Sequence, residues 1–71
     1  NVKKYQALAA FEAGRCKEVL AGGAKDDNKP QEMKKLVGEA ITYYQMIIDK
    51  YPATELVKNA TERIVELGKI E

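Results

Sequence analysis

Residues 30–52 read PQEMKKLVGEAITYYQMIIDKYP, and this stretch carries the clearest structural signal in the chain. Its apolar residues recur at steps of three and four, the spacing that places side chains on one face of an α-helix. They are Met33, Leu36, Val37, Ala40, Ile41, Tyr44, Ile47, Ile48 and Tyr51. With Tyr43 included, the apolar arc covers roughly 160°, wider than the roughly 100° stripe of a helix that packs on one core face. The pattern predicts a helix over about 30–51 with a neighbour on each side.

Both ends of this helix are marked by proline. Pro30 suits the first turn, where its missing N–H has no partner to lose, and Asn28 with Gln31 three residues later resembles a capping box. Pro52 disfavours helical geometry in Tyr51. We therefore expect a side-chain cap from Asn28 and a helix end at residue 51.

The preceding residues predict an amphipathic helix over about 2–21. Its expected inward stripe is Val2, Tyr5, Ala9, Ala13, Cys16 and Leu20. The pair Gly22 and Gly23 is expected to end it, because glycine loses the most backbone entropy in a helix and readily adopts the left-handed turn that follows one. Residues 24–29 then form a polar linker. For Cys16 we favour a buried small hydrophobe over the alternative of a reactive thiol.

A third helix is predicted over about 55–69. Its apolar stripe is Leu56, Val57, Ala60, Ile64 and Leu67. Short connections between helices favour antiparallel neighbours. The expected fold is therefore all-α, with three antiparallel helices forming a single domain over residues 1–71 and the second helix between the other two.

Composition excludes several classes of protein. Twelve basic and eleven acidic residues give a net charge of +1 with the signs interspersed, whereas a nucleic-acid site needs clustered Lys and Arg. No apolar run approaches the roughly 20 residues of a membrane span, so we expect no direct membrane insertion. A chain this short buries only about 60% of its unfolded surface. This, with the lack of an initiating Met, favours a piece of a longer protein or a self-associating one.

The residues needed for common catalytic and metal sites are missing. The sequence has no His and no Ser, which excludes serine–histidine and cysteine–histidine catalysis within the chain, and its one Cys and absent His give no zinc ligand set. Asp26, Asp27 and Asn28 look like the start of a calcium loop, but Gln31 and Val37 stand where that loop needs Gly and Glu. We expect no enzyme, no metal and no cofactor.

Ala40, Tyr44 and Pro52 form a recognisable set. A small residue, an aromatic four residues later and a proline after a further eight resemble the second helix and terminal proline of a tetratricopeptide repeat. Residues 44–55, followed by Ala60, Arg63 and Ile64, are similar to the bacterial envelope branch of that family, which includes outer-membrane lipoproteins. The resemblance implies about one and a half right-handed helical-hairpin repeats in the periplasm or cell envelope, with the cytoplasm as the alternative.

The chain departs from that family in two respects, of which one is its length, since one and a half repeats fall below the roughly three that usually make a stable solenoid. The separation of Gly14 and Ala40 exceeds that of a standard repeat by about 14 residues. We expect this insertion to lengthen the linker and the start of the second helix. An offset of 51 residues relates the first helix to the third, with Ala9 matching Ala60.

The resemblance also implies a binding surface. In the family, first helices of successive repeats line a concave groove that holds a partner protein or peptide. The candidate residues are Leu8, Phe11 and Arg15 on the first helix, with Asn59 and Glu62 at the corresponding places on the third. An equally weighted alternative is that Phe11 packs against a preceding repeat. Tyr43 and Met46 are candidates for a contact between copies in a homo-oligomer.

The sequence therefore predicts a non-enzymatic protein–protein interaction module of tetratricopeptide type, part of a larger bacterial protein. The alternative is a structural C-terminal capping or oligomerisation element without a groove of its own.

Overall fold

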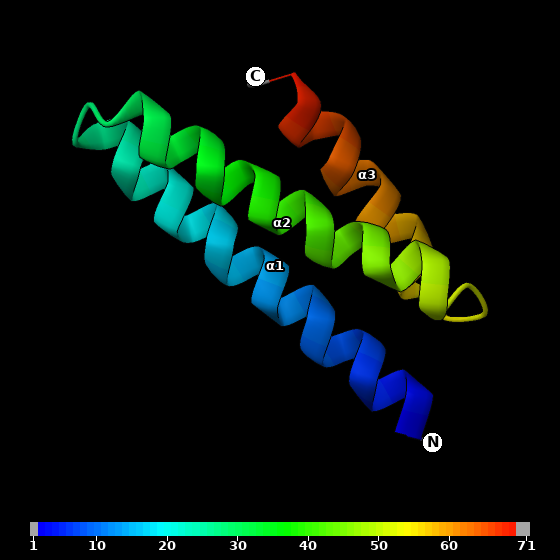
Figure 1. Ribbon diagram of the computed structural model, residues 1–71. Helices are drawn as coiled ribbons and strands as arrows, with labels where there is room; N and C mark the ends of the chain where they lie inside the picture. Colours follow the sequence, from blue (N-terminus) through cyan, green and yellow to red (C-terminus); the bar gives the residue numbers. More distant parts are fainter. Residues whose placement is uncertain (1, 70–71) are drawn as a thin grey trace.

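The computed structural model of the protein describes residues 2–69, which form three α-helices and, over that range, no strand. Helix α1 spans Val2–Asp26, α2 spans Pro30–Lys50 and α3 spans Leu56–Gly68. Helix α2 lies between α1 and α3 and packs on both, as the width of its apolar arc predicts, while α1 and α3 touch each other only slightly (Figure 1). The all-α class is confirmed.

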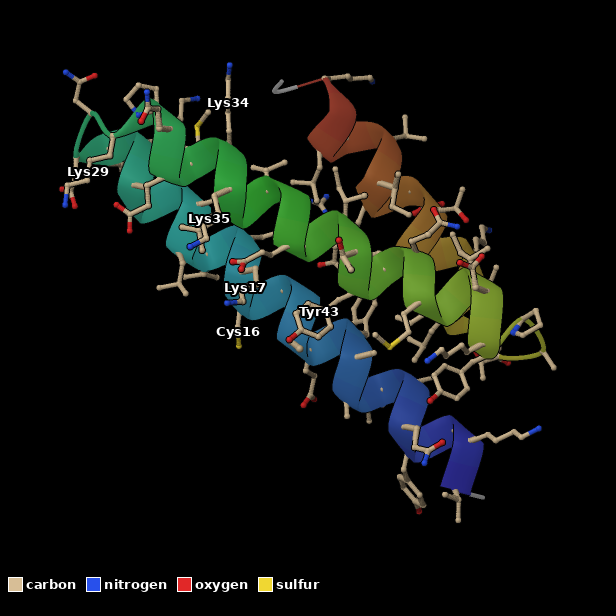
Figure 2. The ribbon with its side chains drawn as sticks, viewed as in Figure 1. Cys16, Lys17, Lys29, Lys34, Lys35 and Tyr43 are labelled. Carbon is tan, nitrogen blue, oxygen red and sulfur yellow. The ribbon has the colours of Figure 1, made fainter. Side chains whose placement is uncertain are left out.

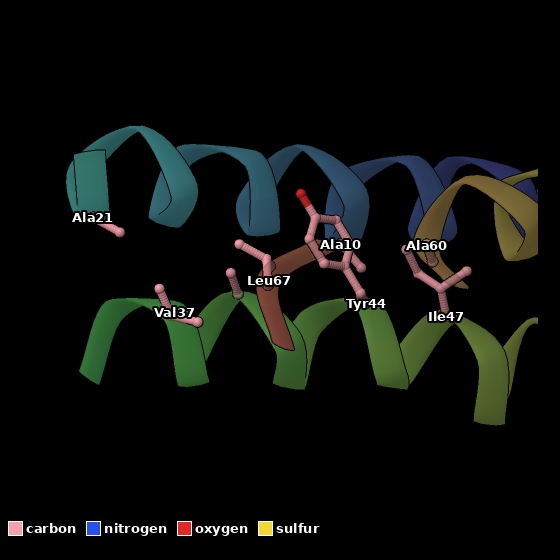
Figure 3. Packing of buried hydrophobic residues seen from close by; sticks show 8 residues of the cluster. Ala10, Ala21, Val37, Tyr44, Ile47, Ala60 and Leu67 are labelled. Atoms are coloured by element: carbon pink, nitrogen blue, oxygen red, sulfur yellow. The ribbon is translucent and has the colours of Figure 1, made fainter. Parts of the chain in front are cut away.

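Helix α2 supplies the large side chains of the core. Tyr44, Ile47 and Val37 are the largest fully buried residues, and they pack with the small residues Ala10 and Ala21 of α1 and with Ala60 and Leu67 of α3 (Figure 3). The buried cluster comprises Ala10, Ala21, Val37, Ala40, Tyr44, Ile47, Ala60 and Leu67. Small residues on the outer helices let their backbones approach α2 closely.

The prediction that Gly22 and Gly23 end the first helix is wrong, because α1 continues to Asp26. Ala21 and Ala24, on either side of the two glycines, are buried. Packing of these alanines offsets the roughly 0.5–1 kcal/mol that each helical glycine costs relative to alanine. The connection to α2 is therefore only residues 27–29, and the first residues of the expected linker instead lengthen α1.

Asn28 ends α1 rather than capping α2. Its φ of 59° lies in the left-handed region, which Asn tolerates better than most residues. The Asn28 N–H donates to the Lys25 carbonyl at 3.1 Å and the Lys29 N–H donates to the Ala24 carbonyl at 2.8 Å, the hydrogen bonds of a Schellman motif. Helix α2 has Lys29 as its N-cap, with no side-chain cap, so the expected capping box is wrong; Pro30 in the first turn is confirmed.

The inward face of α1 also differs from the prediction. The buried residues of α1 are Ala7, Ala10, Gly14, Ala21 and Ala24. Of the expected stripe, Ala13 is half-buried, while the remaining residues are exposed: Val2, Tyr5, Ala9, Cys16 and Leu20. The interpretation of Cys16 as a buried hydrophobe is therefore wrong. The physical reason is that α2 already fills the interface with large side chains, so the smaller of two apolar faces on α1 packs against it.

The end of α2 and the inward face of α3 follow the sequence more closely. Helix α2 ends one residue before Tyr51, whose N–H donates to the Ile47 carbonyl at 2.9 Å, and Pro52 follows in the turn. The Thr54 hydroxyl closes this turn by donating to the Tyr51 carbonyl at 2.9 Å. The predicted inward residues of α3 are all buried or packed on the core, namely Leu56, Val57, Ala60, Ile64 and Leu67.

Candidate functional site

One carboxylate connects all three helices. Glu18 of α1 accepts a hydrogen bond from the Tyr44 hydroxyl of α2. The guanidinium of Arg63, on α3, donates to the same carboxylate through Nε, at 3.3 Å, and through Nη2. The Glu18 side chain is 15% exposed and that of Arg63 is 42% exposed. We call these three residues the interhelical clamp.

The clamp holds its members in defined charge states. Burial alone would raise the pKa of Glu18, but hydrogen bonds from Arg63 and Tyr44 and the charges of Arg63 and Arg15 outweigh burial and lower this pKa. Burial, followed by the hydrogen bond to Glu18, raises the pKa of Tyr44 well above its ordinary value. The hydrogen bond to Glu18 raises the pKa of Arg63. At neutral pH an ion pair and a neutral phenol therefore join the helices, an arrangement suited to positioning α1 and α3 on α2.

The ring of Tyr44 is enclosed by α1. Phe11 packs on it with ring centroids 5.4 Å apart and an interplanar angle of 53°. A methyl group at Gly14 would lie 2.8 Å and 2.9 Å from two carbons of the same ring. Phe11 is half-buried, so this packing explains a residue that the sequence analysis could place only against a partner or a preceding repeat.

A shallow and mainly apolar groove lies between the N-terminal half of α1 and the start of α3. Tyr5 and Leu8 of α1 line one side, Leu56 and Asn59 of α3 line the other, and residues 53–55 close one end. Leu8 is 42% exposed and Asn59 is exposed. The structure thus brings together two of the predicted partner-binding residues, Leu8 and Asn59, across one groove.

The other predicted residues are distributed more widely. Arg15 lines a second hollow, further along α1, with Glu18, Val19 and Arg63. Glu62 is exposed on α3 and lines neither hollow.

Tyr43 and Met46, the candidates for a contact between copies, lie on α2. Met46 is half-buried and packs on the core. Tyr43 is half-buried and lies on the same side of the α1–α2 pair as Lys17, which forms a salt bridge with Glu39 at 3.3 Å (Figure 2). Neither residue lines the hollows between α1 and α3.

The interhelical clamp was not predicted from the sequence. The available signal was Glu18, which falls one helical turn after Gly14 and one turn before Gly22 on a face otherwise made of small residues. The offset of 51 residues also fails to preserve the inward positions, because Ala9 is exposed whereas Ala60 is fully buried.

Two further findings concern the residues that the structure describes. Within residues 2–69 no group of three or more Cys, Asp or Glu side chains is arranged to hold a metal ion. No helix in that range combines the length and apolar character needed to cross a membrane.

Comparisons of the chain with protein-family models, with curated proteins and with solved structures find no match.

Proposed function

We propose that the chain is a non-enzymatic protein-binding module of tetratricopeptide type, with three antiparallel helices forming about one and a half repeats. Its partner is a segment of another protein or peptide held in the groove between α1 and α3. The chain would serve as a scaffold within a larger bacterial protein, as the resemblance of residues 44–55 implies.

The packing of α1 on α2 supports the repeat-like part of this proposal. Ala40 and Tyr44 are fully buried, and Gly14 admits the Tyr44 ring at a distance that no larger residue allows. Pro52 lies in the turn that leads from α2 to α3. A buried small residue, a buried aromatic four residues later and a proline in the following turn are the features that support the repeat-type proposal.

The observation that carries the binding proposal is the exposure of Leu8 opposite Asn59 in one groove. Leu8, Tyr5 and Leu56 offer apolar surface for a side chain of the partner. The Asn59 amide supplies donors and an acceptor, which suits the backbone of an extended peptide. Lys4 and Glu55 at the rim place one charge of each sign beside the apolar surface, favouring a partner with an apolar residue among polar ones.

The test is selection of binders from a random peptide library with the full chain as bait, followed by NMR titration of an enriched peptide. We expect amide shifts in residues 4–8 and 53–59, and loss of binding in Leu8→Asp. Thr42→Asp, an exposed position on α2, is the matched control and should bind normally. Enrichment of no peptide, or shifts confined to other surfaces, would contradict the proposed function.

A further inference from the structure

Helix α1 has a second apolar face, directed away from the core. Tyr5 is 70% exposed, Val19 is 73% exposed and Leu20 is 55% exposed. Cys16 is also exposed, and Figure 2 shows its sulfur pointing away from α2. Single exposed apolar residues are ordinary on a protein surface, but a row of them along one helix marks a surface that another element covers.

This face has the spacing of a coiled-coil seam. Small residues recur at every seventh position, at Ala9, Cys16 and Gly23. Three positions after Val2, Ala9, Cys16 and Gly23 come Tyr5, Glu12, Val19 and Asp26, of which Tyr5 and Val19 are large and apolar. A repeat of seven with two facing positions is the pattern by which one helix packs along another over several turns. We call these positions the outer seam.

We infer that the outer seam is covered by α1 of a second copy of this chain, with the two helices antiparallel and a two-fold axis near residue 14. In this register Ala9 faces Val19 of the second copy, Cys16 faces Glu12, and Gly23 faces Tyr5. These three layers each pair a small residue with a larger one, and the end layer pairs Val2 with Asp26 of the second copy. The two helices can therefore approach at a nearly constant distance between residues 5 and 23.

Charge favours the same direction of pairing. Lys4 lies near the start of α1 and Asp26 ends it, so antiparallel helices bring these opposite charges together at both ends, whereas parallel helices would bring like charges together. Glu12, the charged residue nearest the centre of the seam, comes beside Arg15 of the second copy. Antiparallel packing also opposes the two helix dipoles.

The outer seam and the proposed groove share Tyr5 and the neighbouring Lys4, and the residues at the centre of each surface are different. The groove uses Leu8 at the edge of the seam and Asn59 on α3, whereas the centre of the seam is Ala9 and Cys16. Loss of self-association and loss of peptide binding can therefore be measured separately.

The first test is sedimentation velocity of the full chain between about 1 μM and 1 mM, the range expected for an interface of a single helix pair. We expect a concentration-dependent monomer–dimer equilibrium. Ala9→Glu places a carboxylate in the seam at two symmetric points of each dimer and should weaken dimerisation at least about tenfold without loss of helical circular dichroism. Thr42→Glu adds the same charge on exposed α2 and should leave dimerisation unchanged.

The second test addresses register. Val19→Lys should weaken the dimer on its own, because it buries an ammonium group opposite Ala9. Combined with Ala9→Glu it should restore dimerisation to within about threefold of the original, since the two new charges then face each other across the seam. A monomer throughout the concentration range, or a dimer unaffected by Ala9→Glu, overturns the inference. A double variant no stronger than the single ones overturns the antiparallel register.

Discussion

Replacement of Gly14 by alanine tests the closest approach between two helices in this protein. The added methyl carbon would lie 2.8 Å from one carbon of the Tyr44 ring and 2.9 Å from another, well inside van der Waals contact. The ring has little room to move, because Tyr44 is fully buried and its hydroxyl is bonded to Glu18. We therefore expect Gly14→Ala to force α1 and α2 apart locally.

The magnitude follows from two opposing effects. Overpacking of a close-packed interior costs about 1–3 kcal/mol. Alanine in place of glycine within a helix raises the free energy of unfolding by about 0.5–1 kcal/mol, because it restricts the unfolded chain. Gly14→Ala should therefore lower the free energy of unfolding by about 0.5–2 kcal/mol. Gly22→Ala, on the same helix with no atom within 4 Å of its new methyl group, should raise it by about 0.5–1 kcal/mol.

The assay is urea unfolding followed by circular dichroism, with both variants compared with the original chain at one concentration. Opposite signs for the two substitutions are the expected result. The same stabilisation in both variants would show that Gly14 does not face the Tyr44 ring, and the assigned contact between α1 and α2 would be wrong.

Two other predictions concern the interhelical clamp and the end of α1. The pKa of Glu18 is lower in the folded chain than in the unfolded chain. The ionised carboxylate therefore stabilises the fold fully above the unfolded pKa of about 4.3, and this stabilisation is lost as the pH falls through the folded pKa. Glu18→Gln should therefore lower the free energy of unfolding, measured with urea, by about 1–2 kcal/mol at neutral pH and by clearly less at about pH 3. An equal decrease at both pH values would contradict the clamp. Asn28 has a φ of 59°, which glycine adopts freely and a β-branched residue does not. In thermal unfolding, Asn28→Val should therefore destabilise the chain by about 1–2 kcal/mol, whereas Asn28→Gly should be neutral or stabilising. Equal melting temperatures for the two variants would contradict the left-handed turn.

The fold class and the inward faces of α2 and α3 could be predicted from the sequence because most of their apolar residues keep the three- and four-residue spacing of one continuous helical arc. Ile47 and Leu67, for example, are on predicted stripes and are buried. The ends set by proline were predictable for the same local reason, since Pro30 and Pro52 restrict the backbone whatever the rest of the chain does.

The end of α1 was less predictable because tertiary packing outweighs helix propensity there. Gly22 and Gly23 are strong local signals for a helix end, yet burial of Ala21 and Ala24 carries the helix through them. The turn then falls on Asn28, a residue type that can either cap the start of a helix or adopt the left-handed conformation that ends one. The sequence showed that Asn28 could cap a helix, but not that its backbone would end the preceding one.

The candidate groove was partly predictable and the clamp was not. Leu8 and Asn59 were selected through the family resemblance, and the structure places both along one groove. Glu18 and Arg63 lie in different helices, and their pairing depends on how α1 and α3 are placed on α2. No local pattern encodes that placement.

The sequence predicted that the larger apolar face of α1 would pack on α2, and the core instead takes the smaller face. Burial of Tyr5 and Leu20 would remove more apolar surface from water than burial of alanines, so a helix alone with α2 should favour the larger face. The large side chains of α2 prevent this, because the Tyr44 ring reaches α1 at Gly14 and requires small residues around it. The larger face is therefore left exposed by the packing of the core and not by its own composition. Its heptad spacing is then best understood as a requirement of a second helix outside this fold, which a symmetric copy of α1 meets in both shape and charge.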